Sequence, residues 1–235
     1  MNILNRVDPR KPNEIVNELY DDYKTTIDSF GRAYPEKALG FAEHISECHQ
    51  KFHRFEAEKS PTERMVEVRG FAYLTLDNVY TSMKLLMLGF LTPSGNMLRQ
   101  SLEAACMCIL FATDTSIDVG RKKEIRFYEE YCRNKPFTRS HRAVALVKSN
   151  CDALDVNSEA IARFVTGREF YNQYSHPSEI SMASRFTGQD GDSWLIGGHF
   201  DDARVQIYDK EFSERIKFAE ILPSFIETIY IRATA

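Results

Sequence analysis

The chain has 235 residues, of which 43% are hydrophobic and 27% are charged, with 11 glycines and 8 prolines. This composition excludes a disordered chain and argues against an all-β protein rich in turns. The length allows a substantial core that requires no disulfide or structural metal. The formal net charge is −4, yet residues 121–148 carry nine Lys or Arg against three Glu, so we expect an anionic partner to dock on that segment.

Targeting and membrane signals are weak in this sequence. The N-terminus carries charges with no apolar run behind them, which is not the pattern of a secretory signal. The most apolar stretch, residues 83–91, is about half the ~20 residues that a membrane-spanning helix needs. Five scattered cysteines lie mostly in helical patterns, as expected for reduced, buried thiols. They are Cys48, Cys106, Cys108, Cys132 and Cys151. We therefore predict a cytoplasmic protein without a membrane partner.

Apolar residues recur at helical spacing from the start of the chain. A first amphipathic helix is predicted from Asn13 to Phe30, where Gly31 stops it. A second helix is predicted from Pro35 to the residues before Ser60. Its inner positions are expected to be Leu39, Ala42, Ile45, Phe52 and Phe55.

Residues 62–112 are expected to form the centre of the fold. The periodic run over residues 62–91 is the longest in the chain and predicts a helix with Thr62 or Ser60 as its N-cap. Residues 91–95, Leu-Thr-Pro-Ser-Gly, are expected to break it. The next helix, 96–112, is apolar almost all round, which predicts burial. The two helices should form an antiparallel hairpin.

Helices are also predicted in the second half of the chain. A basic helix is expected over residues 121–132, followed by helices over 139–154 and 158–174. The sequence Ser175-His176-Pro177 should end the last of these, because a residue before proline is pushed out of the α region.

A polar turn is flanked by strand-like segments near the C-terminus. Residues 182–186 and 193–196 predict a β-hairpin, inserted at about residues 181–200. A helix over residues 210–231, which Pro223 can kink, is expected to close the bundle. The predicted fold class is all-α: one helical domain over residues 1–235, a bundle of about seven to eight helices with one short β-hairpin near the C-terminus.

Arg99 and Glu103 are the polar exception in the apolar helix 96–112. They are four residues apart and therefore share a face. A single buried charge costs several kcal/mol, so the two must pair with each other, meet partners on another helix or point into a cavity. Both a salt bridge that fixes helix register and the wall of a site remain open.

A second polar group lies at the end of the helix over residues 158–174. Arg168, Asn172 and His176 are spaced four residues apart and predict one polar stripe, with Tyr171 beside it. His176 would lie at the helix C-terminus, where the dipole favours a protonated imidazole. The stripe fits an anion site or an acid–base pair. The alternative is that His176 only caps the orphan carbonyls of the helix end.

These residues also suggest a family. A buried Arg-x-x-x-Glu (Arg99, Glu103) followed by Tyr-x-x-x-Ser-His-Pro-Ser (Tyr171 to Ser178) resembles uncharacterised bacterial helical proteins that are similar to the HEPN superfamily of helical-bundle ribonucleases, toxins and phage-defence proteins.

The resemblance implies a helical bundle, expected to be a homodimer, that cleaves RNA without a metal. Its catalytic residues would be His176, Arg168, Asn172 and Tyr171, supported by Arg99 and Glu103. The chemistry needs an acid or base of pKa near 7 and a cation for the developing phosphorane charge. Arg168 and His176 are further apart than the Arg and His of active HEPN nucleases, so this would be a degenerate motif.

Basic residues interleaved with aromatic ones predict a nucleic-acid contact surface on the basic segment. They are Arg121, Lys122, Lys123, Arg126, Arg139 and Arg142. The alternative is a solvated helix face. The histidines His49 and His53, four residues apart on a charged face, are expected to be solvated, and neither a metal nor a cofactor is predicted.

Three functions therefore remain open from the sequence. The first is a HEPN-like defence or toxin–antitoxin protein that binds RNA or cleaves it as a metal-independent endoribonuclease. The second is a non-catalytic helical interaction module, working as a homodimer. The third is a sensor of a small anionic ligand.

Overall fold

The computed structural model describes residues 10–120, 123–187, 193–194 and 197–234. Its α-helices are α1 (Pro12–Leu19), α2 (Lys24–Ala33), α3 (Pro35–Ala57), α4 (Glu63–Met87), α5 (Leu91–Phe111), α6 (Phe127–Cys132), α7 (Ala143–Ser149), α8 (Ser158–Asn172), α9 (Glu179–Ala183) and α10 (Val205–Thr234). Three single-turn 3-10 helices are η1 (Pro136–Thr138), η2 (Ser140–Arg142) and η3 (Asp202–Arg204). Its strands are β1 (Ser116–Asp118), β2 (Glu124–Arg126), β3 (Phe186–Thr187) and β4 (Ser193–Trp194). The mostly helical fold class is confirmed.

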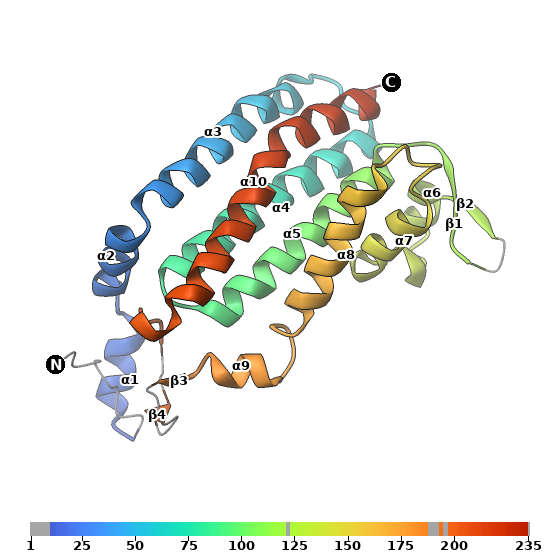
Figure 1. Cartoon of the computed structure of the whole chain (residues 1–235). Coiled ribbons are helices and arrows are strands. Elements are labelled where there is room, and N and C mark those ends of the chain that lie inside the picture. The colour runs from blue at the N-terminus through green and yellow to red at the C-terminus, as the bar shows by residue number, and fades with distance from the viewer. Residues whose placement is uncertain (1–9, 121–122, 188–192, 195–196, 235) are drawn as a thin grey trace.

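Four long helices, α3, α4, α5 and α10, form the body of the fold (Figure 1). The hairpin of α4 and α5 is the most extensive pairing, α10 packs along α3 and α4, and α8 packs on the other side of α5. None of the described helices is both long and apolar enough to cross a bilayer.

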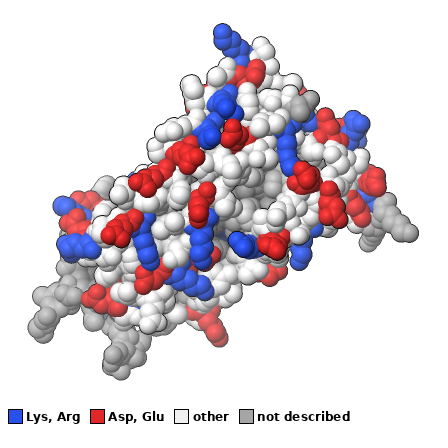
Figure 2. All heavy atoms as spheres, turned by 45° about the horizontal axis from the view of Figure 1, so that its top comes forward, with Lys and Arg blue, Asp and Glu red and all other residues white. Residues whose placement is uncertain are grey.

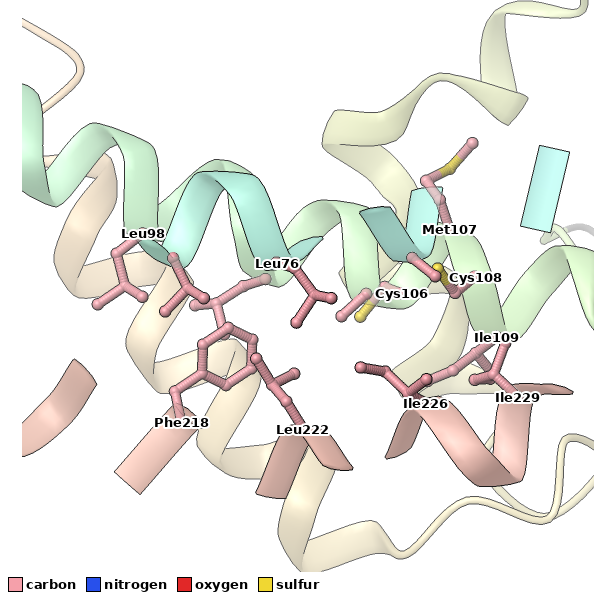
Figure 3. Packing of buried hydrophobic residues seen from close by; sticks show 14 of the residues in the cluster. Leu76, Leu98, Cys106, Met107, Cys108, Ile109, Phe218, Leu222, Ile226 and Ile229 are labelled. Carbon is pink, nitrogen blue, oxygen red and sulfur yellow. The ribbon is translucent and has the colours of Figure 1, made fainter. Parts of the chain in front are cut away.

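The core is made where α10 meets the central hairpin. Phe218 and Leu222 of α10 point toward Leu76 of α4 and Leu98 of α5 (Figure 3). Leu76 and Leu222 are 1% exposed and Leu98 is 2% exposed. Each such side chain stabilises the fold by roughly 1.5–3 kcal/mol relative to an exposed one.

The junction of α4 and α5 differs from its prediction. Thr62 caps α4 as expected, and its side chain accepts a hydrogen bond from the backbone N–H of Met65 at 3.2 Å. The break comes earlier than residues 91–95, at Leu88–Phe90, where Gly89 has a φ of +80°. Pro93 lies in the first turn of α5, where a missing backbone N–H costs nothing because those donors have no partner within the helix.

The N-terminal helix predictions are partly wrong. The first helix is two helices, α1 and α2, separated at Tyr23, which has a left-handed φ of +53°. In α3, Phe52 and Phe55 are buried as expected, but Leu39 is 62% exposed. Phe41 occupies the inward position instead. The register of a helix with charged residues on several sides was therefore set by packing against α10.

The prediction of one hairpin, near the C-terminus, is also partly wrong. The longer hairpin lies mid-chain, where β1 pairs with β2 in antiparallel register, Ile117 opposite Ile125. The predicted basic helix is thus a strand followed by the short α6. At the expected place, α9 occupies residues 179–183, and only two residue pairs join β3 to β4. Residues 188–192, the predicted tip, are outside the described residues.

The helix over residues 139–154 is also shorter than predicted, with η2 before it and α7 covering only Ala143–Ser149. By contrast, α10 is longer than expected, and Pro223 lies inside it without ending it.

Candidate functional site

Polar side chains of α4, α5, α8 and α10, and of the turn that follows α8, collect in two clusters. The first, here called the open cluster, consists of Asn96, Arg99, Glu103, Arg168 and Ser175. The second, the sealed network, consists of Ser82, Ser94, Tyr171, Tyr174, Glu211 and Arg215. They differ in exposure and in how completely their donors are used.

Two arginines share one carboxylate in the open cluster. Arg99 Nη1 donates to Glu103 Oε1 at 2.7 Å, and Arg168 Nε donates to the same oxygen at 3.3 Å. The side chain of Glu103 is 7% exposed, whereas those of Arg99 and Arg168 are 17% and 27% exposed. The cluster therefore carries one positive charge in excess, on guanidinium groups that solvent reaches.

The open cluster also ties α5 to its neighbours. Asn96 Oδ1 accepts from Arg99 Nη2 at 3.2 Å and from Ser175 Oγ at 2.7 Å. Arg168 Nη2 donates to the backbone carbonyl of His141 in η2 at 2.9 Å. A guanidinium has five N–H donors, so Arg168 keeps donors beyond these two bonds for an anion.

Sequence spacing explains why these residues meet. Asn96, Arg99 and Glu103 are three and four residues apart and so lie on one face of α5. Arg168 reaches that face because α8 packs closely on α5: a Cβ at Gly167 would lie 3.3 Å from Leu102 Cδ1.

Arg215 is the centre of the sealed network and is 0% exposed. Its Nη1 donates to Glu211 Oε2 at 2.6 Å, and its Nε and Nη2 donate to the hydroxyls of Ser82 and Ser94 at 2.9 and 2.5 Å. The two serines also bond each other's backbone carbonyls at 2.7 Å, which joins α4 to α5. Every nitrogen of the guanidinium group has a partner, as a buried charge requires.

Two tyrosines complete the sealed network. Tyr171 and Tyr174 donate their hydroxyls to the two oxygens of Glu211 at 3.1 and 3.2 Å. Burial raises the pKa of both tyrosines, and the Glu211 carboxylate raises them further, so both stay protonated donors. Gly95 admits the ring of Tyr174, since a Cβ there would lie 2.7 Å from Tyr174 Cγ.

The predicted stripe along α8 is therefore divided in space. Arg168 joins the open cluster and Tyr171 the sealed network. Asn172 ends α8 and is exposed, and His176 lies four residues beyond that end and is exposed as well. No hydrogen bond or ion pair within the described ranges involves the side chain of Asn172 or His176. Of the arrangements that the sequence left open for Arg99 and Glu103, two occur together: the residues pair with each other, and Glu103 also meets Arg168 of α8.

The basic segment lies on the surface, in part as predicted. Lys123, Arg126, Arg139 and Arg142 are exposed, and Arg126 lies 3.7 Å from Glu129 in an ion pair. Arg121 and Lys122 lie outside the described residues. Acidic and basic side chains are interspersed over the face drawn in Figure 2, with no broad region of one sign.

A groove of about 660 Å³ lies where α4 begins, against α6 and η1. Its lining residues are Glu63, Val66, Glu67, Tyr128, Tyr131, Cys132, Asn134, Thr138 and Arg139. Burial raises the pKa of Tyr128 to about 12, with contributions from Cys132, Glu63 and Glu67.

Glu211 and Arg215 are absent from the residues predicted for the site, although their positions on the inner stripe of α10 predict that they are buried. Residues 211, 215, 218, 222, 226 and 229 recur at three- and four-residue steps, and all six are buried. A Glu and an Arg four residues apart on the inner stripe of a helix predict a buried ion pair.

No group of three or more His, Cys, Asp or Glu side chains that could hold a metal occurs in the described part of the chain. No family model matches the sequence, and no curated protein or solved structure matches it either.

Proposed function

We propose that the protein binds RNA, with the open cluster and the adjoining η2 residues as its contact for backbone phosphates. The observation that carries this proposal is the convergence of Arg99 and Arg168 on the single carboxylate of Glu103. One positive charge stays uncompensated there, and both guanidinium groups remain partly exposed. A guanidinium with free N–H donors suits the two oxygens of a phosphate.

The neighbouring turn extends the site. Arg139, just before η2, lines the groove at the start of α4. The backbone of His141 is bonded to Arg168, which brings the exposed Arg142 and the His141 ring near the open cluster. A second and a third phosphate contact would come from these side chains. RNA, with phosphates at regular spacing, fits such a row better than an isolated anion.

We propose binding rather than cleavage. Cleavage of RNA requires an acid or base within hydrogen-bond reach of the reacting oxygens. Among the described residues, Glu103 is the one titratable side chain bonded to Arg99 or Arg168, and both arginines already engage it. His176, the catalytic residue that the HEPN resemblance implies, forms no hydrogen bond or ion pair with either arginine among the described residues. The defence or toxin–antitoxin role remains a prediction of that resemblance.

The test is binding of a short, fluorescently labelled single-stranded RNA in EDTA, followed by anisotropy over a range of salt concentrations. Arg168→Gln is expected to weaken binding and to reduce the slope of log affinity against log salt by about 0.7, the value for one lost contact to a single strand. The matched control is Arg163→Gln, since Arg163 is exposed on the same helix.

Other outcomes would contradict the proposal. Equal effects of Arg168→Gln and Arg163→Gln would place the contact elsewhere. Competition by inorganic phosphate as strong as that by RNA would favour a sensor of small anions. Cleavage of the RNA in EDTA that is lost in His176→Ala would restore the ribonuclease hypothesis.

A second candidate is the non-catalytic interaction module, favoured by one observation. The sealed network is fully satisfied and closed to solvent, so the most elaborate polar arrangement of the fold serves packing. No RNA binding by the pure protein, together with a stable self-association, would favour this candidate over the first.

A further inference from the structure

The outer face of α4 carries an apolar stripe that is about half exposed, with the Tyr73 ring 5.9 Å from the Phe52 ring of α3. Val66, Tyr73 and Tyr80 are 44%, 54% and 51% exposed, and Leu74 beside them is 42% exposed. The first three are seven residues apart, so they lie one above another, two turns at a time. With Lys84 at its far end, the stripe is about 27 Å long at 1.5 Å per residue.

Gly70 lies in the middle of this stripe. Glycine destabilises a helix interior relative to alanine, and a Cβ at Gly70 would meet nothing within 4 Å. Packing inside this chain therefore does not require a glycine at this position. A glycine on an outer helix face does permit another backbone to approach closely.

The charges beside the stripe are unpaired within this chain. Across the parts of the chain that the structure describes, Arg69, Asp77, Lys84 and Glu63 take part in no ion pair. Arg69 and Asp77, which have opposite charges, are equally far from Tyr73 along the helix: Arg69 is four residues before it and Asp77 is four residues after it. Lys84, eleven residues after it, corresponds to the helix start at Thr62 and Glu63.

This pattern of charges is complementary to itself when two copies of α4 pack antiparallel. In two copies of α4 that pack antiparallel about a two-fold axis at Tyr73, residues equally distant from Tyr73 face each other. Arg69 then faces the opposite Asp77, and Val66 faces the opposite Tyr80. A parallel pairing would place Arg69 against Arg69 and Asp77 against Asp77, which is unfavourable.

The groove at the start of α4 provides the end contact. Glu63 and Glu67 line it with Tyr128 and Tyr131. In the antiparallel arrangement, Lys84 of the second copy arrives at this end of the stripe. Carboxylates and aromatic faces both attract an ammonium group.

We propose that a second copy of this chain docks on the outer face of α4, giving a homodimer in which the two α4 helices pack antiparallel about a two-fold axis at Tyr73. The proposal does not depend on RNA binding, because the open cluster lies on α5 and α8.

The first experiment is a charge exchange, read by sedimentation equilibrium of the full chain. Asp77→Arg and Arg69→Asp are each expected to raise the dimer dissociation constant about tenfold or more, because like charges then face each other. The double variant should return to within about threefold of the wild-type constant. Glu220→Arg, at an exposed position of α10, is the matched control and should leave the constant unchanged.

The second experiment is a crosslink at the axis. Tyr73→Cys in a Cys132→Ser background should form a disulfide-linked dimer on mild oxidation, since a residue on the two-fold axis meets its own copy. Leu39→Cys, equally exposed but on α3, should not. Circular dichroism checks that each variant is folded.

A wild-type chain that sediments as a monomer would overturn the proposal. So would a dimer whose dissociation constant is unaffected by Asp77→Arg, or a double variant that stays as weak as the single ones. Loss of RNA binding with an intact dimer would contradict only the proposed function.

Discussion

The open cluster and the sealed network both contain side chains of α5 and α8, but the sealed network also includes residues of α4 and α10, and only the sealed network is closed to solvent. In the sealed network, one arginine meets one glutamate, and serine and tyrosine hydroxyls use the remaining groups out of reach of solvent. In the open cluster, two arginines meet one glutamate, and solvent reaches both. The difference is that every guanidinium nitrogen of Arg215 is used inside the fold, whereas Arg99 and Arg168 keep solvent-accessible donors, which is why the proposed RNA contact lies there.

The comparison predicts its largest effect at Arg215. Arg215→Met should lower the free energy of unfolding by roughly 3–5 kcal/mol, because Glu211 is left as a buried, uncompensated charge. Urea denaturation measures this. Arg163→Met, at an exposed position, should stay within about 0.5 kcal/mol of wild type.

A double variant separates loss of the pair from loss of packing. Arg215→Met combined with Glu211→Leu should recover part of the loss, because no buried charge then remains. A loss of less than about 1 kcal/mol in Arg215→Met alone would show that the network is not sealed in solution.

The next effect is expected at the tyrosine hydroxyls. Tyr171→Phe removes a hydrogen bond to the buried Glu211 carboxylate and should cost about 1.5–3 kcal/mol by the same urea measurement. Tyr20→Phe, at a position 85% exposed, is the control and should be neutral. An equal effect of the two changes would argue against the bond.

The same tyrosines predict a dependence on alkaline pH. Their pKa values in the folded state are raised above the ordinary 10.0. A group with a raised folded-state pKa stabilises the fold below its unfolded pKa, and this contribution is lost as the pH rises above about 10. The free energy of unfolding should therefore fall less steeply over that range in Tyr171→Phe than in wild type.

A smaller effect on stability is expected in the open cluster. Arg168→Gln should change the free energy of unfolding by less than about 1 kcal/mol, because the ion pair is partly exposed and Arg99 still engages Glu103. Added salt should reduce this difference further. A loss as large as that of Arg215→Met would mean that the two clusters do not differ in kind.

The smallest effect is expected at His176. His176→Ala should leave the free energy of unfolding within about 0.5 kcal/mol of wild type, since the ring is exposed. The salt slope of RNA binding should also be unchanged. A changed slope would place His176 in the contact surface despite its distance from the end of α8.

Much of the helical fold could be predicted because long amphipathic periods are strong signals. α4 and α10 are such helices, α5 is recognisable because it is apolar almost all round, and the Thr62 cap is visible in the sequence. The mid-chain hairpin was missed because β1 and β2 have three residues each, too few for alternation to be distinguished from a helix. The burial predicted for Leu39 is wrong because α3 can be rotated about its axis to bury either Leu39 or Phe41, and the sequence alone does not distinguish the two.

The candidate site was predicted less well than the fold. Spacing places Arg99 and Glu103 on one helix face, because residues four apart on a helix are neighbours, but it leaves open whether they pair with each other or with another helix. The sequence places Arg168 on a polar stripe. It does not reveal that its partner is Glu103, because Glu103 lies on another helix. Spacing extended the stripe to His176, whereas α8 ends at Asn172 and leaves that histidine in solvent.

The sequence by itself determined that this protein is mostly helical, that its centre is the hairpin of α4 and α5, and that the charges of Arg99 and Glu103 need partners. These properties follow from periodicity and from the cost of an isolated buried charge, both of which are local. Only the tertiary structure decided which polar residues would be sealed and which would stay open. That division depends on how α8 and α10 cross α5, and such crossings are set by the packing of the whole core.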